Sequence, residues 1–417
     1  MFRASTPLAF VLTALVAGCI NSDPATCTTD NPDYPDCLPE DDGKADSASA
    51  GMAQMNDLTI VMPLATTQAQ FDGYLPAKDL LPKALYTSKF PDPSGGHPIG
   101  SDVTMTYDHL RVVAVRLDPC FAQIGPVTDP SGCDNQLRIV FQSLDFANGS
   151  TSAIDGAVHA FYRLSREQLI AAIKDIVALR KANGQTTAMG PLAPHPLIVK
   201  QGEDGAFAQG LNAILLKYAS PANLIRFTHF QSSNLQTVWG FAGFDYDGSS
   251  QTPMVIPNLP NQATSVSFFQ GFASPMNGGF TPESTAKDSV TLLANAANAK
   301  AATKSAQQAA YDAALRIENP NFQSPNTIDC ASCHVGNAAR LLIGDDVLGL
   351  SATGNPNLFT RNPKFVSARS MKQTTNVRTQ PLNVHMLSYR NDKLMIGQRV
   401  INETAATVAY VNGVLLH

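Results

Sequence analysis

The residue pattern of the chain changes near residue 281. Before that point, short apolar runs alternate with turn residues, and six of them are typical of strands. These runs span 58–64, 111–117, 137–144, 224–230, 237–244 and 265–272. Two helices are expected among them, one that begins at Ser165 with the capping-box partner Gln168, and one over 207–218. For residues 57–280 we therefore expect a β-rich α+β domain, with a β-sandwich as one form that it could take.

The segment from 281 onward is rich in alanine and reads as helical. Pro320 ends a long helical run. The last run carries apolar residues at helical spacing, namely Ile401, Ala405, Val408, Val411 and Leu415. The pattern predicts a second, all-α domain over residues 281–417, so the chain should be multidomain.

The first 18 residues have the pattern of an export signal. Arg3 precedes the apolar run Leu8–Ala17, which as a helix would span about 15 Å, roughly half of the hydrocarbon core of a membrane. Small residues then lead to Cys19. We expect residues 1–18 to be removed on export. Residues 19–56, rich in Asp, Pro, Ser and Gly, are expected to form a flexible tether.

Seven cysteines are an odd number for an exported protein. Cys27 and Cys37 bracket a Pro- and Asp-rich segment, and Cys120 and Cys133 bracket a turn-rich loop. Each pair is expected to form a disulfide in an oxidising compartment, with free thiols as the alternative. The formal net charge of −5 gives no reason to expect a nucleic-acid partner.

Two further cysteines stand in the motif C-A-S-C-H, formed by Cys330, Cys333 and His334. A zinc site would need two more ligands at suitable spacing, and the nearest other cysteine is the distant Cys133. A redox dithiol would need a buried strand before its first cysteine, which the preceding residues do not predict. Covalent haem fits better, because thiols at i and i+3 share one face of a helical turn and the adjacent imidazole can bind the iron.

The chain from about residue 285 to its end resembles a mono-haem class I cytochrome c, with a helix, the C-x-x-C-H motif, a variable loop and a C-terminal helix that carries Tyr410. The resemblance implies haem c attached to Cys330 and Cys333, His334 as its proximal ligand, and a redox partner protein. Residues 57–280 resemble no family that we recognise.

The N-terminus is similar to a bacterial lipoprotein signal. That resemblance implies cleavage before Cys19 and a lipid anchor on its sulfur. Ile20 is not the aspartate that favours inner-membrane retention, so the outer membrane is favoured, at its periplasmic face or at the cell surface.

In the cytochrome family a methionine before the last helix is the second axial ligand. Met386 follows a proline in a non-helical stretch and has a similar spacing to Tyr410, so it is the first candidate. Met395, Met371 and His385 are alternatives, as is an iron whose second axial position is open. A histidine ligand would give the haem a lower reduction potential than a methionine would. The remaining histidines, His159 among them, are expected in ordinary polar or surface positions.

These observations predict a membrane-anchored electron carrier with one covalent haem. One alternative is a haem-dependent enzyme or ligand sensor with an open iron position. Another is a surface-binding lipoprotein in which the haem is structural. No catalytic residue is predicted for any of the three.

Overall fold

The structure is a computed structural model. It describes residues 52–86, 107–119, 134–154, 156–232, 238–253, 263–269, 272–275, 288–323, 330–359, 386–390 and 392–416. The predicted signal, residues 19–51 of the predicted tether and both predicted disulfides lie outside these residues. The prediction of a flexible tether is wrong for residues 52–56, because Ala53 and Met55 are buried in the apolar core and a helix begins at Met55. No described helix has the length and apolar character that crossing a membrane requires.

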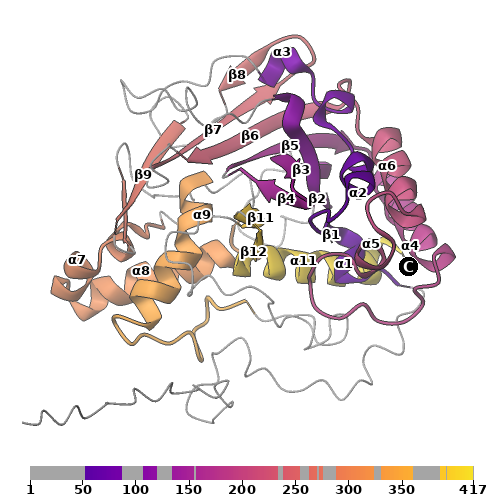
Figure 1. Cartoon of the computed structure of the whole chain (residues 1–417). Helices are drawn as coiled ribbons and strands as arrows, with labels where there is room; N and C mark the ends of the chain where they lie inside the picture. Colours follow the sequence, from indigo (N-terminus) through magenta and orange to yellow (C-terminus); the bar gives the residue numbers. More distant parts are fainter. Residues whose placement is uncertain are drawn as a thin grey trace, which may run out of the picture.

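A large antiparallel sheet of ten strands dominates the described part of the chain (Figure 1). Its main path runs in the order β1-β2-β3-β5-β6-β7-β9-β10, while β4 pairs with β3 and β8 with β7. The strands are β1 (Thr59–Val61), β2 (Leu110–Asp118), β3 (Asn135–Ala147), β4 (Ser150–Ala153), β5 (Gly156–Leu164), β6 (Leu224–Ser232), β7 (Val238–Tyr246), β8 (Gln251–Pro253), β9 (Ala263–Phe269) and β10 (Phe272–Pro275). Each of the six predicted runs overlaps a strand, although 58–64 is a strand only over Thr59–Val61 and 265–272 extends from β9 to the first residue of β10.

Two groups of helices belong to the N-terminal half. The short α1 (Met55–Leu58), α2 (Gln68–Gly73) and α3 (Lys83–Tyr86) lie around β1 and β2 in the sequence. The longer α4 (Arg166–Ala182), α5 (Pro196–Gln201) and α6 (Ala206–Tyr218) follow β5. The capping box predicted for α4 is confirmed, since the Ser165 hydroxyl accepts a hydrogen bond from the amide of Gln168, whose side chain accepts one from the Ser165 amide.

The C-terminal part supplies more helices and a small hairpin. Its helices are α7 (Ala296–Ala301), α8 (Lys304–Glu318), α9 (Cys330–Ala339) and α11 (Gln398–Tyr410). The hairpin pairs β11 (Leu387–Arg390) with β12 (Lys393–Ile396). One π-helical turn, Arg340–Asp345, extends α9, and another, Val411–Leu415, extends α11.

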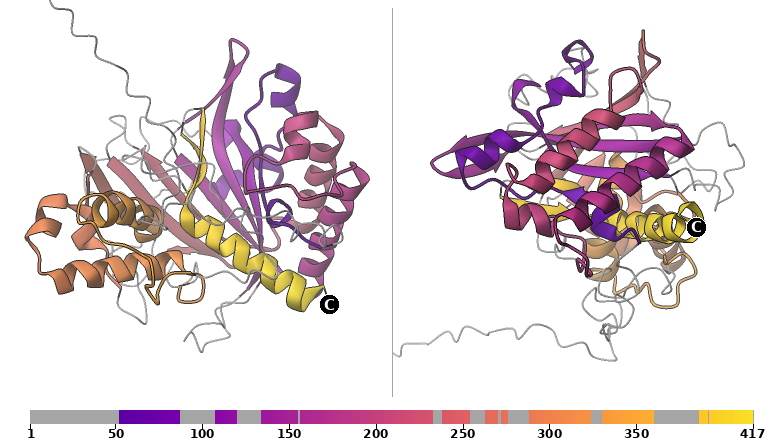
Figure 2. Two further views of the ribbon diagram at one scale, coloured as in Figure 1. Left: turned by 90° about the horizontal axis from the view of Figure 1, so that it is seen from below. Right: turned by 90° about the vertical axis from the view of Figure 1, so that its right-hand side faces the viewer.

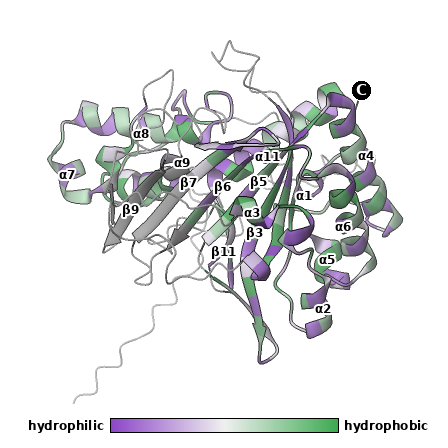
Figure 3. Cartoon of the chain, turned by 90° about the horizontal axis from the view of Figure 1, so that it is seen from above, coloured by the Kyte–Doolittle hydropathy of each residue, from purple (hydrophilic) through white to green (hydrophobic). Residues whose placement is uncertain are grey.

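Both faces of the sheet are covered, which explains why successive residues of β2 and β3 are buried alike. Helices α4 and α6 pack together on one face, where α4 contacts β3 and β5. Figure 3 shows apolar and polar residues on different sides of these helices. On the other face β11 contacts β2 and β3, and Gln142 of β3 makes hydrogen bonds to the main chain of Tyr389. Figure 2 shows α11 on the opposite side of the sheet from α4 and α6.

The predicted fold class is wrong in two respects. The β-rich part is one sheet covered by helices, and the C-terminal part is not a separate all-α domain. It contains β11 and β12, and one apolar core runs from Ala53 to Leu415. Helix α11 lies against α1, and the hydroxyls of Thr59 and Thr404 are 2.7 Å apart. The C-terminal part therefore belongs to the same α+β fold as the sheet, because the apolar stripe of α11 packs against the N-terminal half of the chain.

Candidate functional site

The C-x-x-C-H motif opens helix α9, so that its residues lie in the first two turns of one helix. The side chain of Cys330 is outside the described set, whereas Cys333 is half-buried and His334 is 9% exposed. Helix α9 contacts β7, β9 and β10. Consequently Cys333 and His334 both face the interior of the protein.

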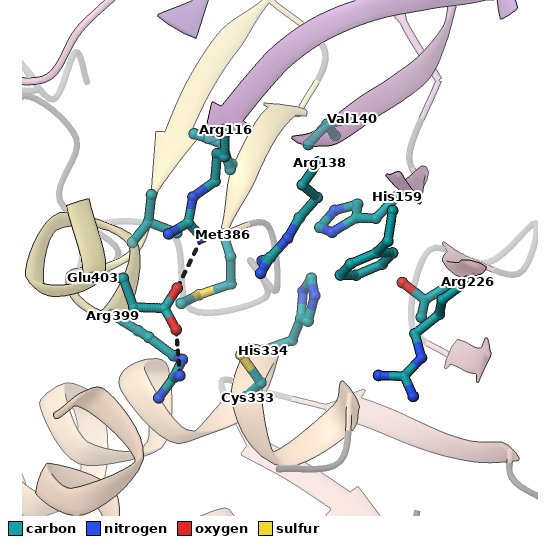
Figure 4. Close-up of a pocket in the computed structure, with 14 residues that line it drawn as sticks. Arg116, Arg138, Val140, His159, Arg226, Cys333, His334, Met386, Arg399 and Glu403 are labelled. Atoms are coloured by element: carbon teal, nitrogen blue, oxygen red, sulfur yellow. Dashed lines mark hydrogen bonds and ion pairs between the residues drawn. The ribbon is translucent and has the colours of Figure 1, made fainter. Parts of the chain in front are cut away.

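Cys333 and His334 line a pocket between α9, α11, β11 and one face of the sheet (Figure 4). The cavity has a volume of ≈ 90 Å³ and opens partly to solvent. A bound group at this position would therefore extend from the cavity into its open side.

The floor of the pocket consists of two rows of side chains that cross neighbouring strands. One row follows the strand register through Arg116, Arg138, Phe161 and Arg226, and the next through Val140, His159 and Thr228. Successive side chains of a strand point to opposite faces, so residues two apart, such as His159 and Phe161, share this face. Sheet register alone brings these seven residues together.

The roof of the pocket comes from the C-terminal segment. Met386 and Leu387 lie at the start of β11, and Arg399, Val400 and Glu403 lie on α11. Met386 is 4% exposed, and its carbonyl accepts a hydrogen bond of 2.9 Å from the amide of Gly397. Its thioether lies so close to Gly397 that a Cβ atom there would overlap the sulfur.

Arginine dominates the charge of the pocket. Arg116 is 2.8 Å from Glu403 and 3.1 Å from Asp118, and Arg138 is 2.9 Å from Asp118. Arg399 also pairs with Glu403. Burial alone would raise the pKa of Glu403, but Arg399, Arg116 and Arg138 outweigh it and lower that pKa to about 2. Glu403 is therefore ionised and holds this cluster of arginines together.

Part of the arginine hydrogen-bonding capacity is unused. The Nε atoms of Arg116 and Arg138 are buried and have no hydrogen-bond partner within the described part of the chain. Arg138 is only 7% exposed and lines the pocket. Buried donors are normally satisfied, so these atoms favour a bound group that carries hydrogen-bond acceptors such as carboxylate oxygens. The two propionate groups of a haem would meet that requirement.

His159 is a site residue that the sequence did not reveal. Its ring centroid is 6.3 Å from that of His334, and Phe230 lies 4.8 Å from His334 on the same measure. Burial lowers the pKa of His159 well below its usual range, and the charges of His334, Arg138 and Arg116 lower it further. The imidazole is therefore neutral and keeps a nitrogen lone pair. Only the sheet register could have indicated this position.

The predicted distal ligands have different outcomes. Met386 lines the pocket with Cys333 and His334. Met395 is buried in β12 and does not line this pocket. Met371 and His385 lie outside the described residues, as does the predicted lipid-attachment site Cys19. Across the described ranges, no group of three or more His, Cys, Asp or Glu side chains is placed to hold a metal ion.

Comparison with known proteins adds no assignment. No protein-family model, curated protein or solved structure matches this chain. The functional argument therefore depends on the motif and the pocket alone.

Proposed function

We propose that this protein is an exported, lipid-anchored c-type cytochrome that carries one covalent haem and transfers electrons. The observation that carries the proposal is the position of the motif. Cys333 and His334 line a partly open pocket on one face of the sheet, together with Arg116, Arg138 and Met386, instead of facing bulk solvent. The fold around that pocket is not that of a class I cytochrome c, so the proposal rests on the attachment chemistry and not on the family fold.

In this proposal each wall of the pocket has a part. Cys330 and Cys333 hold the haem through thioether bonds, and His334 is the proximal ligand. When bound, the haem supplies reversible one-electron chemistry at its iron. Arg116 and Arg138 bind its carboxylates, because a guanidinium group matches a carboxylate in charge and geometry. Leu387 and Val400 line the roof and limit the access of water.

The remaining parts of the proposal concern location. A lipid on Cys19 anchors the chain to a membrane, with the outer membrane favoured, and residues 19–51 hold the folded part away from the surface. Disulfides Cys27–Cys37 and Cys120–Cys133 suit the same oxidising compartment. A redox partner protein exchanges electrons with the haem through the mouth of the pocket.

The first experiment is production of the full chain, with its own signal, in a bacterium that has c-type cytochrome maturation. A pyridine haemochrome spectrum and haem staining of a denaturing gel then measure covalent haem. We expect one haem per chain in the wild type and none in the double variant Cys330→Ala/Cys333→Ala. Met395→Leu, outside the pocket, should leave the haem content unchanged. A wild-type chain without covalent haem would overturn the proposal.

A haem-dependent enzyme or ligand sensor is the second candidate, favoured by the partial opening of the pocket to solvent. An iron with an exchangeable sixth position binds carbon monoxide when it is reduced, whereas an iron held by two protein ligands resists it. Optical titration of the reduced protein with carbon monoxide therefore separates this candidate from an electron carrier.

A further inference from the structure

We propose that His159 of strand β5 is the second axial ligand of the haem, opposite His334. This inference rests on the proposed function and replaces Met386, the ligand that the sequence favoured. It assigns iron binding jointly to the sheet and to helix α9, the two parts that the sequence had assigned to separate domains.

The first argument is the separation of the two imidazoles. Their ring centroids are 6.3 Å apart and the rings are inclined by 48°. A metal–nitrogen bond to histidine is about 2 Å, and a ring nitrogen is roughly 1 Å from the ring centre, so two histidines on opposite sides of one metal have centroids about 6 Å apart. Rotation about the two metal–nitrogen bonds leaves the angle between the rings open. The observed separation of 6.3 Å matches the value for two histidines on opposite sides of one metal.

The second argument is the rigidity of His159. It lies within the central strand β5, where it is paired with Val140 of β3 and with Thr228 of β6. Its ring lines the pocket and makes no hydrogen bond to any described residue. A strand that is hydrogen-bonded on both sides holds its side chains in place better than a loop does. His159 thus presents a fixed ring to the site.

The third argument is the orientation of Met386. Its sulfur and terminal methyl lie against Gly397, at the start of α11. In Figure 4 the thioether points toward the side of Arg399 and Glu403, whereas the His159 ring lies beside the ring of His334. Met386 would have to leave Gly397 to bind an iron held by His334. His159 already has the required separation.

The test is the spectrum of the full-length, haem-loaded protein. The oxidised wild type should lack the methionine–iron charge-transfer band and should show the near-infrared magnetic circular dichroism of bis-histidine haem. His159→Ala should lose the low-spin signal in electron paramagnetic resonance and should bind carbon monoxide when reduced. Met386→Leu, of similar volume, should leave all these spectra unchanged.

The results that would contradict the assignment to His159 can be distinguished from those that would contradict the cytochrome proposal. A methionine–iron band in the wild type that disappears in Met386→Leu would overturn the assignment to His159 and leave the cytochrome proposal intact. Carbon monoxide binding by the reduced wild type would also overturn the assignment. A wild-type chain without covalent haem would overturn both proposals. The wild-type spectra decide the matter even if His159→Ala does not fold.

Discussion

Arg116 of β2 and Glu403 of α11 form a buried ion pair with 2.8 Å between Nη1 and Oε2, although 287 positions separate them in the sequence. Arg399 pairs with the other carboxylate oxygen of Glu403. The carboxylate therefore joins the C-terminal helix to the sheet at the edge of the proposed haem pocket. Its loss would leave two arginines buried without their shared counter-charge.

We expect Glu403→Gln to lower the free energy of unfolding at neutral pH by about 3–5 kcal/mol, the usual cost of breaking a buried ion pair by removing one partner. The pKa of Glu403 is lowered in the folded state, to about 2. The stabilisation is therefore present above the ordinary value of 4.5 and is lost as the pH falls toward 2. Urea unfolding at neutral and at acidic pH measures both effects.

Glu167→Gln is the matched control for this variant, because Glu167 is exposed in the first turn of α4. Its unfolding free energy should stay within about 0.5 kcal/mol of the wild type. A Glu403→Gln protein as stable as this control would contradict the structural role given to the ion pair.

His195 should make the protein sensitive to mild acid. Its Nδ1 accepts a hydrogen bond of 3.3 Å from the amide of Leu197 at the start of α5, and its ring stacks on Phe207 at 4.2 Å. Burial lowers its pKa to about 3, and Arg180 adds to the shift. In the unfolded chain His195 takes up a proton near its ordinary pKa of 6.5. In the folded chain it takes up that proton only when the pH reaches about 3. The contribution of the neutral His195 ring to stability is therefore fully present above pH 6.5 and is lost as the pH falls toward 3.

His195→Asn tests this prediction, because asparagine is a good helix cap but does not titrate. The variant loses the ring stacking and should be less stable at every pH. Its free energy of unfolding should nevertheless decline less steeply than that of the wild type between pH 6.5 and 3. Denaturant titrations at several pH values give the two slopes, and equal slopes would show that His195 is not the acid-sensitive group.

Local signals explain what the sequence could predict of the fold. Short apolar runs predicted the strands β2 and β3, and the Ser165 capping box predicted the start of α4. These signals depend on a few neighbouring residues. Local residues do not determine which surface the apolar stripe of α11 packs against, because that surface is distant in the sequence. The same stripe would suit a small helical domain, but here it packs against α1 and the sheet. The prediction of a separate all-α domain failed for that reason.

The same division holds for the candidate site. The motif at Cys333 and His334 can be recognised because thioether attachment and iron binding need adjacent residues on one helix. His159 and Arg138 carry no such local mark, and they reach the pocket only because β3 and β5 pair in one register. A shift of that register by one residue would place the two side chains on opposite faces of the sheet.

Gly73 should not tolerate a side chain. A Cβ atom at this position, the last residue of α2, would lie 2.5 Å from the main-chain carbonyl carbon and oxygen of Glu203. Backbone atoms cannot move aside as the end of a flexible side chain can. We expect Gly73→Ala to lower the free energy of unfolding by about 1–3 kcal/mol, measured by urea or thermal unfolding. The exposed neighbour Asp72→Ala is the control, and equal stability of the two variants would contradict the close approach of α2 to Glu203.

Arg138 should influence the midpoint potential of the proposed haem. A buried positive charge stabilises the reduced state, which carries one positive charge fewer than the oxidised state, so its removal should lower the potential. We expect Arg138→Gln to lower the midpoint by something on the order of tens of millivolts, in a potentiometric titration followed by absorbance. Arg138→Lys keeps the charge and should stay closer to the wild type, and Arg163→Gln, exposed on the same strand as His159, should not differ from it. A midpoint that is unchanged or higher in Arg138→Gln would mean that Arg138 does not act on the haem.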